Sequence, residues 1–507
     1  MLKKLSVLVF LLMVVLAASV AADTTYYNID LVPYGIFTGN VQTSGSDNAG
    51  VFVYIAGTSI VGTTDAAGDY TIVGVPLGSH DLTFSKIGYS DQQSFSNTIS
   101  SVGQVVIIPT VNLVAGSTTE QQLFGEAMMY YSYDNFDMAI TDLRSLVAGN
   151  PGGQLAAVSS HRIGLAFGSM NQLDSAVTAL TNCINTYPSD TIMPMTYYWR
   201  GVYRSSLEDY SGALSDFQYV LTNYPTNYIA DRAQYRLGRT YEALNNNSQA
   251  IVAYQALVTN YPSSVDVPAA IYNIGWLNYT SDNFSAALAN FNDLINNHAA
   301  SPEAASASYY KGMCYFNQED FTNALSSFNA SITNYPSGDK LTDSWYYRAS
   351  CKYNLEAYTY SDAKADYQYI VTNFPNSDRA PHAAYYLGNC EYNLNSYNNA
   401  LTHYQNFLTN YPNNDWVPQA IYKIASTYYA DQNYSAALTQ YQLFYNSYPD
   451  NKDAGDAHYW AGKCYEKLTD DISAHDEYCT VITQYPNCSK YENAVTRRDT
   501  IGLATCP

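Results

Sequence analysis

The sequence is poor in charged residues, and most of its charges are negative. Asp, Glu, Lys and Arg make up 13% of the 507 residues, and 44 acids against 23 Lys and Arg give a net charge of −21. Nucleic acids and anionic membrane surfaces are bound through a concentrated basic face. The composition therefore argues against both as main partners.

Long apolar runs are missing except at the N-terminus. Lys3 and Lys4 precede an apolar run at 5–17, and small residues follow before Asp23. This order is typical of a secretory signal peptide, so we predict that residues 1–22 are removed and the chain is exported. An uncleaved anchor helix is the alternative, although the run is short for a bilayer span. No Cys lies near the cleavage point, so lipid modification of the bacterial lipoprotein kind is not expected.

Sequence motifs of catalysis are also missing. The chain has no phosphate loop ending in Lys-Ser/Thr, no Gly-x-Ser-x-Gly, no His-Glu-x-x-His and no Cys-x-x-Cys. Its seven histidines are scattered without i, i+4 pairing. We predict that the protein is not an enzyme and binds no cofactor or metal. An envelope hydrolase with an unrecognised site is the least favoured alternative.

The segment 23–117 differs in composition from the rest of the chain. It contains no Cys or Trp and is rich in Gly, Thr, Ser and Val. Its short runs of alternating apolar and polar residues predict strands at 35–42, 50–56, 59–63, 69–73, 80–86 and 104–113. These would form a small antiparallel β-sandwich.

The turns of this segment resemble those of the carboxypeptidase regulatory-like domain, a transthyretin-like β-sandwich. The matching stretches are Gly39-Asn40-Val41, 49–54, 64–72, Val75-Pro76-Leu77-Gly78 and 82–89. The resemblance implies an accessory domain of secreted proteins and no activity. Asp65, Asp69 and Asp81 are interpreted as turn residues, because calcium takes about six to eight oxygen ligands.

The rest of the sequence repeats every 37 residues. A short run that mostly ends in Asn-Tyr-Pro recurs at Pro151, Pro188, Pro225, Pro262, Pro336, Pro375, Pro412, Pro449 and Pro486. Ala299 replaces the missing Pro between Pro262 and Pro336, and a two-residue insertion near Tyr358 lengthens one interval to 39. Ten repeat units therefore fit the chain.

Each unit is expected to form two helices. Ala stands twelve residues before each Pro or its Ala299 equivalent, Gly or Ala stands 24 residues before it, and an aromatic stands eight residues before it in eight units. Small residues let two helix backbones approach closely, and Pro ends the second helix. Pro194, Pro268, Pro302, Pro381 and Pro418 suit the first turn of the following helix.

These landmarks resemble the tetratricopeptide repeat over about residues 118–490, with 491–507 as a C-terminal cap. The resemblance implies an α-solenoid of about ten helical hairpins after the β-sandwich, an all-β plus all-α chain. Long units ending in Tyr-Pro are also similar to those of the outer-membrane barrel-assembly lipoprotein and the Tol-Pal coordinator. That closer match is weaker, because this chain has no lipidation Cys and twice as many repeats.

The cysteines are expected to be structural. Cys314, Cys351, Cys390 and Cys464 recur two residues after the small position of the first helix, which indicates packing. Cys479, Cys488 and Cys506 cluster at the C-terminus. We predict a disulfide between Cys488 and Cys506, with three free thiols as the alternative.

A ladder of tyrosines is the candidate binding feature. It stands three residues before the small position in eight consecutive units, at Tyr198, Tyr235, Tyr272, Tyr309, Tyr346, Tyr385, Tyr422 and Tyr459. First helices line the groove in the tetratricopeptide family, so the ladder would border a groove for an extended peptide or a glycan. Packing between neighbouring first helices is the alternative.

We therefore predict a non-enzymatic scaffold for protein partners, exported to the periplasm, the outer membrane or the cell surface, with a role in outer-membrane or cell-surface assembly. A glycan-binding, adhesive or self-polymerising surface protein that uses the tyrosine-lined groove is the alternative function.

Overall fold

The computed structural model describes residues 35–44, 47–55, 60–86, 89–90, 92–115, 119–502 and 506. The expected signal peptide lies outside these residues. The chain divides into two compact units, 1–236 and 237–507. The division falls inside helix α8 (Ala230–Ala243), so the β region shares a unit with the first three helical hairpins.

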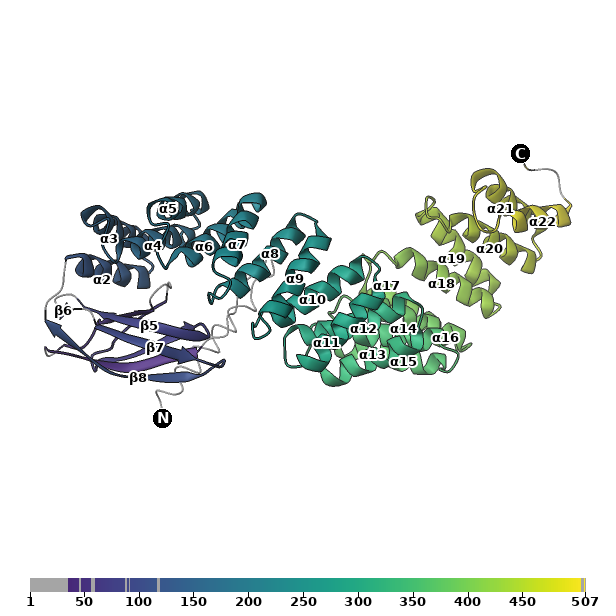
Figure 1. The fold of residues 1–507 in the computed structure, drawn as a ribbon. Coiled ribbons are helices and arrows are strands. Elements are labelled where there is room, and N and C mark those ends of the chain that lie inside the picture. The colour runs from purple at the N-terminus through teal and green to yellow at the C-terminus, as the bar shows by residue number, and fades with distance from the viewer. Residues whose placement is uncertain are drawn as a thin grey trace. The chain divides into compact units, whose positions relative to one another are not determined.

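The β region consists of two four-stranded sheets (Figure 1). One sheet has the order β4-β1-β8-β6 and the other β3-β2-β5-β7. The strands are β1 (Gly35–Thr43), β2 (Phe52–Ile55), β3 (Val61–Thr63), β4 (Asp69–Val75), β5 (Gly78–Ser85), β6 (Tyr89–Ser90), β7 (Gln92–Ile99) and β8 (Val105–Ala115). Their inward side chains, among them Phe37, Ile72 and Phe84, form one buried core.

All six expected strands are present, but two features of the sheets differ from the prediction. β6 and β7 were missed because their sequence is mostly polar, without an apolar alternation. The sandwich is also not purely antiparallel, since β1 and β8 pair in parallel from Ile36 opposite Val105 to Thr43 opposite Leu113. Pairing partners so far apart in sequence leave no local signal of strand direction.

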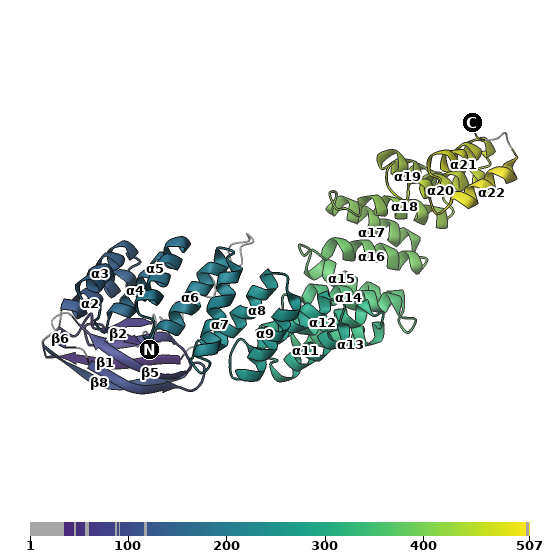
Figure 2. The ribbon, with the colours of Figure 1, turned by 45° about the horizontal axis from the view of Figure 1, so that its top comes forward.

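The helical region forms the predicted solenoid of ten hairpins within residues 119–502, as the ribbon shows from two directions (Figures 1 and 2). We number the hairpins one to ten, from α2–α3 to α20–α21, and α22 follows them. The helices are α2 (Thr119–Ser132), α3 (Phe136–Gly149), α4 (Ala156–Ser169), α5 (Leu173–Thr186), α6 (Met193–Ser206), α7 (Tyr210–Asn223), α8, α9 (Asn247–Asn260), α10 (Val267–Thr280), α11 (Phe284–Asn297), α12 (Glu303–Asn317), α13 (Phe321–Asn334), α14 (Leu341–Asn354), α15 (Tyr360–Asn373), α16 (Ala380–Asn393), α17 (Tyr397–Asn410), α18 (Val417–Ala430), α19 (Tyr434–Ser447), α20 (Ala454–Lys467), α21 (Asp471–Gln484) and α22 (Tyr491–Ile501).

The small positions explain how each hairpin closes. The ten alanines of the second helices are fully buried. A Cβ at Gly275 would lie 2.6 Å from the ring of Phe291, and one at Gly312 would lie 2.5 Å from the ring of Phe328. In six hairpins the aromatic side chain of the second helix therefore lies directly over the glycine of its own first helix, whereas Leu180 takes this place over Gly164. The two positions depend on each other.

The turns between the paired helices follow one pattern with one exception. Nine hairpins have a single residue with positive φ in the turn, between Asp134 and Thr469 in the chain. Hairpin seven has the longer loop 355–359 instead, and Thr359 forms a capping box with Asp362 at the start of α15. This loop accommodates the predicted insertion. Pro194, Pro268, Pro381 and Pro418 lie in first helical turns, as expected, and Pro302 is the N-cap of α12.

Candidate functional site

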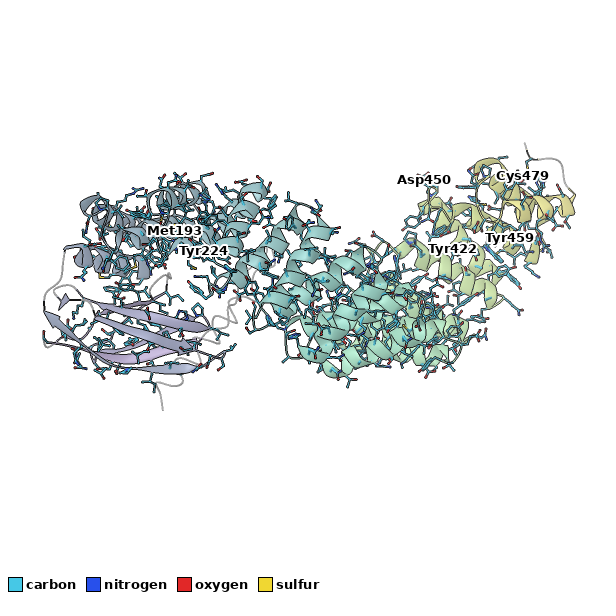
Figure 3. All side chains as sticks on the ribbon, viewed as in Figure 1. Met193, Tyr224, Tyr422, Asp450, Tyr459 and Cys479 are labelled. Atoms are coloured by element: carbon cyan, nitrogen blue, oxygen red, sulfur yellow. A yellow bond between two sulfur atoms is a disulfide. The ribbon has the colours of Figure 1, made fainter. Side chains whose placement is uncertain are left out.

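The tyrosine ladder is a packing position. Tyr198, Tyr309, Tyr346, Tyr385 and Tyr459 are at most 8% exposed, and Tyr235, Tyr272 and Tyr422 are half-buried. Figure 3 labels Tyr422 and Tyr459 on the first helices of hairpins nine and ten. Burial raises the pKa of the Tyr309, Tyr346 and Tyr385 hydroxyls above its ordinary value. The ladder is therefore not an open stripe of eight rings. Four of its rings contact rings of their own hairpin and of the next one, at Tyr272, Tyr309, Tyr346 and Tyr385, as the packing alternative expects.

The residue that follows the ladder tyrosine is the more accessible of the two in hairpins three, six, seven, eight and ten. This position is half-buried in all eight hairpins and aromatic in five of them, at Trp199, Tyr310, Tyr347, Tyr386 and Trp460. Three of these rings stack on the second-helix aromatic of the preceding hairpin: Tyr310 on Phe291, Tyr347 on Phe328 and Tyr386 on Tyr367. The interplanar angles are 25°, 21° and 14°. One face of each of these three rings is therefore covered by an aromatic ring of the preceding hairpin.

Two of these rings, Tyr347 and Tyr386, line a cavity in the second unit, which we call the aromatic pocket. Its volume is about 350 Å³. The lining residues are Phe316, Tyr346, Tyr347, Ser350, Tyr353, Asn354, Tyr367, Arg379, His382, Tyr386 and Trp416. All but Tyr367 belong to the first helices α12, α14, α16 and α18 or to their N-caps. A concave, mostly aromatic site with a few polar groups is the usual form of a ligand site.

Arg379 and His382 give the aromatic pocket its polar side. The Arg379 guanidinium lies 5.1 Å from the ring centroids of both Tyr346 and Tyr347, and its Nε donates to Asp343 at 2.5 Å. The His382 ring meets Trp416 edge to face at a centroid distance of 4.4 Å. The pocket can therefore hold an apolar or aromatic group against ring faces and place a polar group beside a cation.

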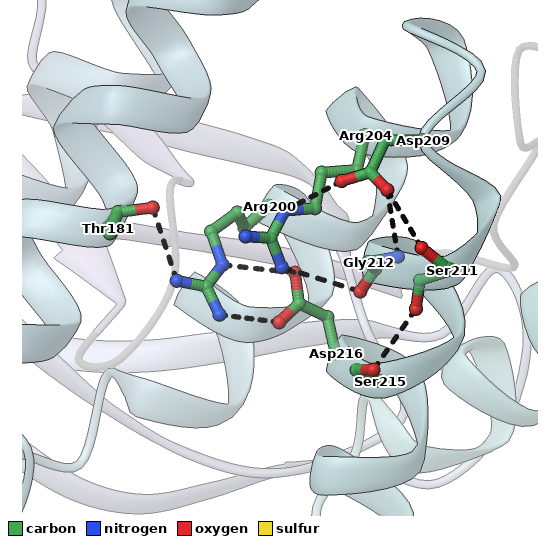
Figure 4. Close-up of polar contacts among 8 residues, drawn as sticks. All are labelled: Thr181, Arg200, Arg204, Asp209, Ser211, Gly212, Ser215 and Asp216. Atoms are coloured by element: carbon green, nitrogen blue, oxygen red, sulfur yellow. Dashed lines mark hydrogen bonds and ion pairs between the residues drawn. The ribbon is translucent and has the colours of Figure 1, made fainter.

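A separate cluster of buried charges recurs in hairpins three and seven. In hairpin three, Arg200 donates to both carboxylate oxygens of Asp216 at 3.0 and 2.6 Å, and Arg204 donates to Asp216 at 2.9 Å (Figure 4). In hairpin seven, Arg348 donates to Asp366 at 2.8 and 2.6 Å, and Lys352 lies 2.8 Å from the same carboxylate.

A stacked ring pair covers the arginine in both hairpins. Tyr197 and Tyr219 stack at 3.9 Å, and Trp345 and Tyr369 stack at 4.0 Å. The guanidinium lies over the first ring of each pair, at 5.1 Å from Tyr197 and 3.9 Å from Trp345. We call this arrangement of two cations, one carboxylate and two rings the ion-pair module. It went unnoticed in the sequence, although aligning hairpins three and seven by their small positions, Gly201 and Ala349, would have found it.

The recurring cysteines are core residues, as predicted. Cys314, Cys351, Cys390 and Cys464 are buried thiols, and burial raises their pKa to about 12. A thiol with such a pKa stays protonated and unreactive at neutral pH.

The predicted disulfide is wrong in one partner. Cys506 bonds to Cys479 on α21, at a sequence separation of 27, and Cys488 remains a half-buried thiol. Cys488 follows α21 and packs beside Gly455 of α20. The order of three cysteines along the chain does not reveal which one faces the returning terminus.

The described residues contain neither a cluster of metal ligands nor a helix that could span a membrane. No group of three or more His, Cys, Asp or Glu side chains there is arranged to hold a metal ion. No helix in the described parts of the chain has both the length and the apolar character needed to cross a membrane.

Comparisons with known families identify the repeats. Residues 159–190, 232–264 and 272–339 match families described as tetratricopeptide repeat, and residues 377–501 match a family described as outer membrane lipoprotein. These parts of the helical region are therefore similar to tetratricopeptide repeats, and its C-terminal part is similar to the outer membrane lipoprotein family. The matches all lie in the helical region, and the family of the β region stays a prediction.

A comparison with curated proteins found no match. Among solved structures, a tetratricopeptide repeat protein from Parabacteroides merdae is 15% identical and covers 53% of this chain and 98% of that chain, with a TM-score of 0.35. The C-terminal part of a repeat protein from Cytophaga hutchinsonii is 14% identical, covers 51% and 98%, and has a TM-score of 0.41. MamA from Desulfovibrio magneticus RS-1 is 18% identical, covers 37% and 99%, and has a TM-score of 0.31. At these TM-scores the likeness adds nothing to the family matches.

Proposed function

We propose that the protein is a non-enzymatic scaffold of the bacterial cell envelope that binds an extended segment of a partner protein in the aromatic pocket. The pocket is the observation that carries this proposal. Its half-buried rings at Tyr347, Tyr386 and Trp416 have accessible edges or faces, and desolvated aromatic residues dominate the binding energy of protein interfaces.

The dimensions of the pocket suit a side chain better than a whole folded partner. A volume of about 350 Å³ is near the lower end of small-molecule sites. An extended segment places alternate side chains about 7 Å apart, so one apolar or aromatic side chain would enter the pocket while its neighbours lie along the first helices. Arg379 and His382 would contact polar groups of the same segment.

The envelope location rests on the family match. Residues 377–501, which include Arg379, His382, Tyr386 and Trp416 of the pocket, match the family described as outer membrane lipoprotein. The expected signal peptide at 1–22 supports export of the chain. We therefore propose assembly of envelope proteins as the process in which the scaffold acts.

The test compares two tyrosine variants in a pull-down from bacterial envelope extract. Tyr386→Ala removes a ring of the pocket, whereas Tyr358→Ala removes a ring that is 40% exposed on the loop of hairpin seven, outside the pocket. We expect the wild type and Tyr358→Ala to retain the same polypeptides and Tyr386→Ala to lose them. Retention of all of them by Tyr386→Ala would overturn the proposal.

A polysaccharide array run with the same three proteins tests the alternative function. Stacked aromatic rings also bind sugar rings, so a glycan-binding surface protein could use the same pocket. Binding of a polysaccharide by the wild type and its loss in Tyr386→Ala, without any captured polypeptide, would favour that alternative.

A further inference from the structure

Hairpin two contains a cavity at the place where hairpins three and seven have the ion-pair module. Its volume is about 410 Å³. It lies among α3, α4 and α5 and is lined by Arg144, Ser160, Ile163, Phe167, Asp174, Ser175, Thr178, Ala179 and Asn182. All of these residues belong to the first unit.

The equivalence follows from the repeat register. Ser160 stands four residues before the small residue Gly164, as Tyr197 stands before Gly201 and Trp345 before Ala349. Asn182 corresponds in the same way to Tyr219 and Tyr369, because it follows the second-helix core residue by two positions. The two stacked rings of the module are therefore replaced by two small polar side chains, and the cavity occupies their place.

The charges of the module are replaced as well. Ile163 stands where the module has Arg200 or Arg348, and Ala179 stands where it has the carboxylate of Asp216 or Asp366. The cation of the cavity comes from Arg144 on α3, whose guanidinium lies 5.6 Å from the ring centroid of Phe167. Among the described residues no carboxylate lies within ion-pair distance of Arg144.

We propose that this cavity binds an aromatic side chain of a partner polypeptide in which an acidic residue stands beside the aromatic one. The ring would take the place of the module's own rings, between Ser160 and Asn182. Its face would lie near the planar guanidinium of Arg144, which stacks on aromatic rings and pairs with carboxylates. The acidic neighbour would supply Arg144 with the paired carboxylate that the module provides at the position of Ala179; Asp174 also lines the cavity but forms no ion pair with Arg144.

This site is independent of the proposed function, because none of its lining residues belongs to the aromatic pocket. A negative result for ligand binding at one of the two sites would therefore not contradict the proposal for the other. The cavity would recognise a ring with an adjacent acid, whereas the aromatic pocket has its own rings and its own cation, Arg379.

The test uses three capped probes and the full-length chain, with binding followed by saturation-transfer NMR. The probes are acetyl-Asp-Trp-amide, acetyl-Lys-Trp-amide and methyl β-glucopyranoside. We expect the Asp-Trp probe to bind about threefold more tightly than the Lys-Trp probe, because a rim ion pair contributes modestly. Arg144→Gln should abolish this preference. Failure of the Asp-Trp probe to bind, or binding of the glucoside in its place, would overturn the proposal.

A variant that fills the cavity locates the site. Ser160→Trp with Asn182→Tyr copies the ring pair of hairpin seven, and we expect it to abolish binding of the Asp-Trp probe and to raise the melting temperature. Asn182→Tyr alone, at an exposed position of α5, serves as the milder variant and should weaken binding. Thr259→Trp, at an exposed position of α9, is the control and should bind like the wild type. Unchanged probe binding in both cavity variants would refute the assignment.

Discussion

The buried His161 should make the first unit sensitive to mild acid. This histidine of α4 is fully buried, and its Nδ1 lies 3.0 Å from the Thr196 hydroxyl. Thr196 donates its own hydroxyl proton to the Ile192 carbonyl. Nδ1–H is therefore the donor to Thr196, and the bare Nε2 has no hydrogen-bond partner among the described residues. Burial, and secondly the charge of Arg162, lower the pKa of His161 to about 3.

The sign of the effect follows from the lowered pKa. Between pH 6.5, the ordinary pKa of His, and about pH 3, the unfolded chain binds a proton that the folded chain does not. The free energy of unfolding therefore falls as the pH falls below 6.5. At about 1.4 kcal/mol per unit of pH, acidification from about pH 7.5 to pH 5 should cost about 2 kcal/mol.

The variant His161→Asn isolates this contribution. The Asn side chain can still donate to Thr196 but cannot be protonated, so its free energy of unfolding should lose about 2 kcal/mol less than that of the wild type over the same pH range. His298→Asn in the second unit is the matched control. Urea unfolding at each pH, followed by hydrogen exchange in peptides of α4, reports the first unit. Equal losses in the wild type and His161→Asn would refute the reasoning, whatever the other histidines contribute.

Three further changes test the packing of the solenoid. Gly275→Ala should lower the free energy of unfolding by about 1–2 kcal/mol in a urea titration, because the new methyl group meets the Phe291 ring; a neutral effect would show that the ring moves freely. Asp366→Asn should lower the free energy of unfolding by about 3 kcal/mol, because it leaves two cations beside a neutral amide at a buried site. A decrease below about 0.5 kcal/mol would contradict the buried ion pair. Cys506→Ser should lower the stability of the last hairpin by about 3 kcal/mol, from the 27-residue separation that the disulfide closes; unchanged hydrogen exchange in α21 would contradict this.

The sequence predicted where the tyrosine ladder lies on the first helices, but it left open whether the rings are exposed or packed. The ladder lies on the first helices, as the 37-residue register implied, but most of its rings are buried. The accessible position is the next residue along the helix, for example Tyr347 and Tyr386. A rotation of about 100° separates neighbouring residues of a helix. The repeat period could not determine which of the two faces outward, because that depends on how closely the following hairpin packs.

The sequence by itself determined the repeat length, the number of hairpins, the glycine and alanine contacts and the helix ends. These features depend on residues within one repeat, where small side chains, aromatic side chains and Pro have fixed local consequences. Only the tertiary structure decided the parallel pairing of β1 with β8, the partner of Cys506, the aromatic pocket and the cavity of hairpin two. Each of these depends on contacts between residues far apart in the chain, and the order of residues along the chain does not specify such contacts.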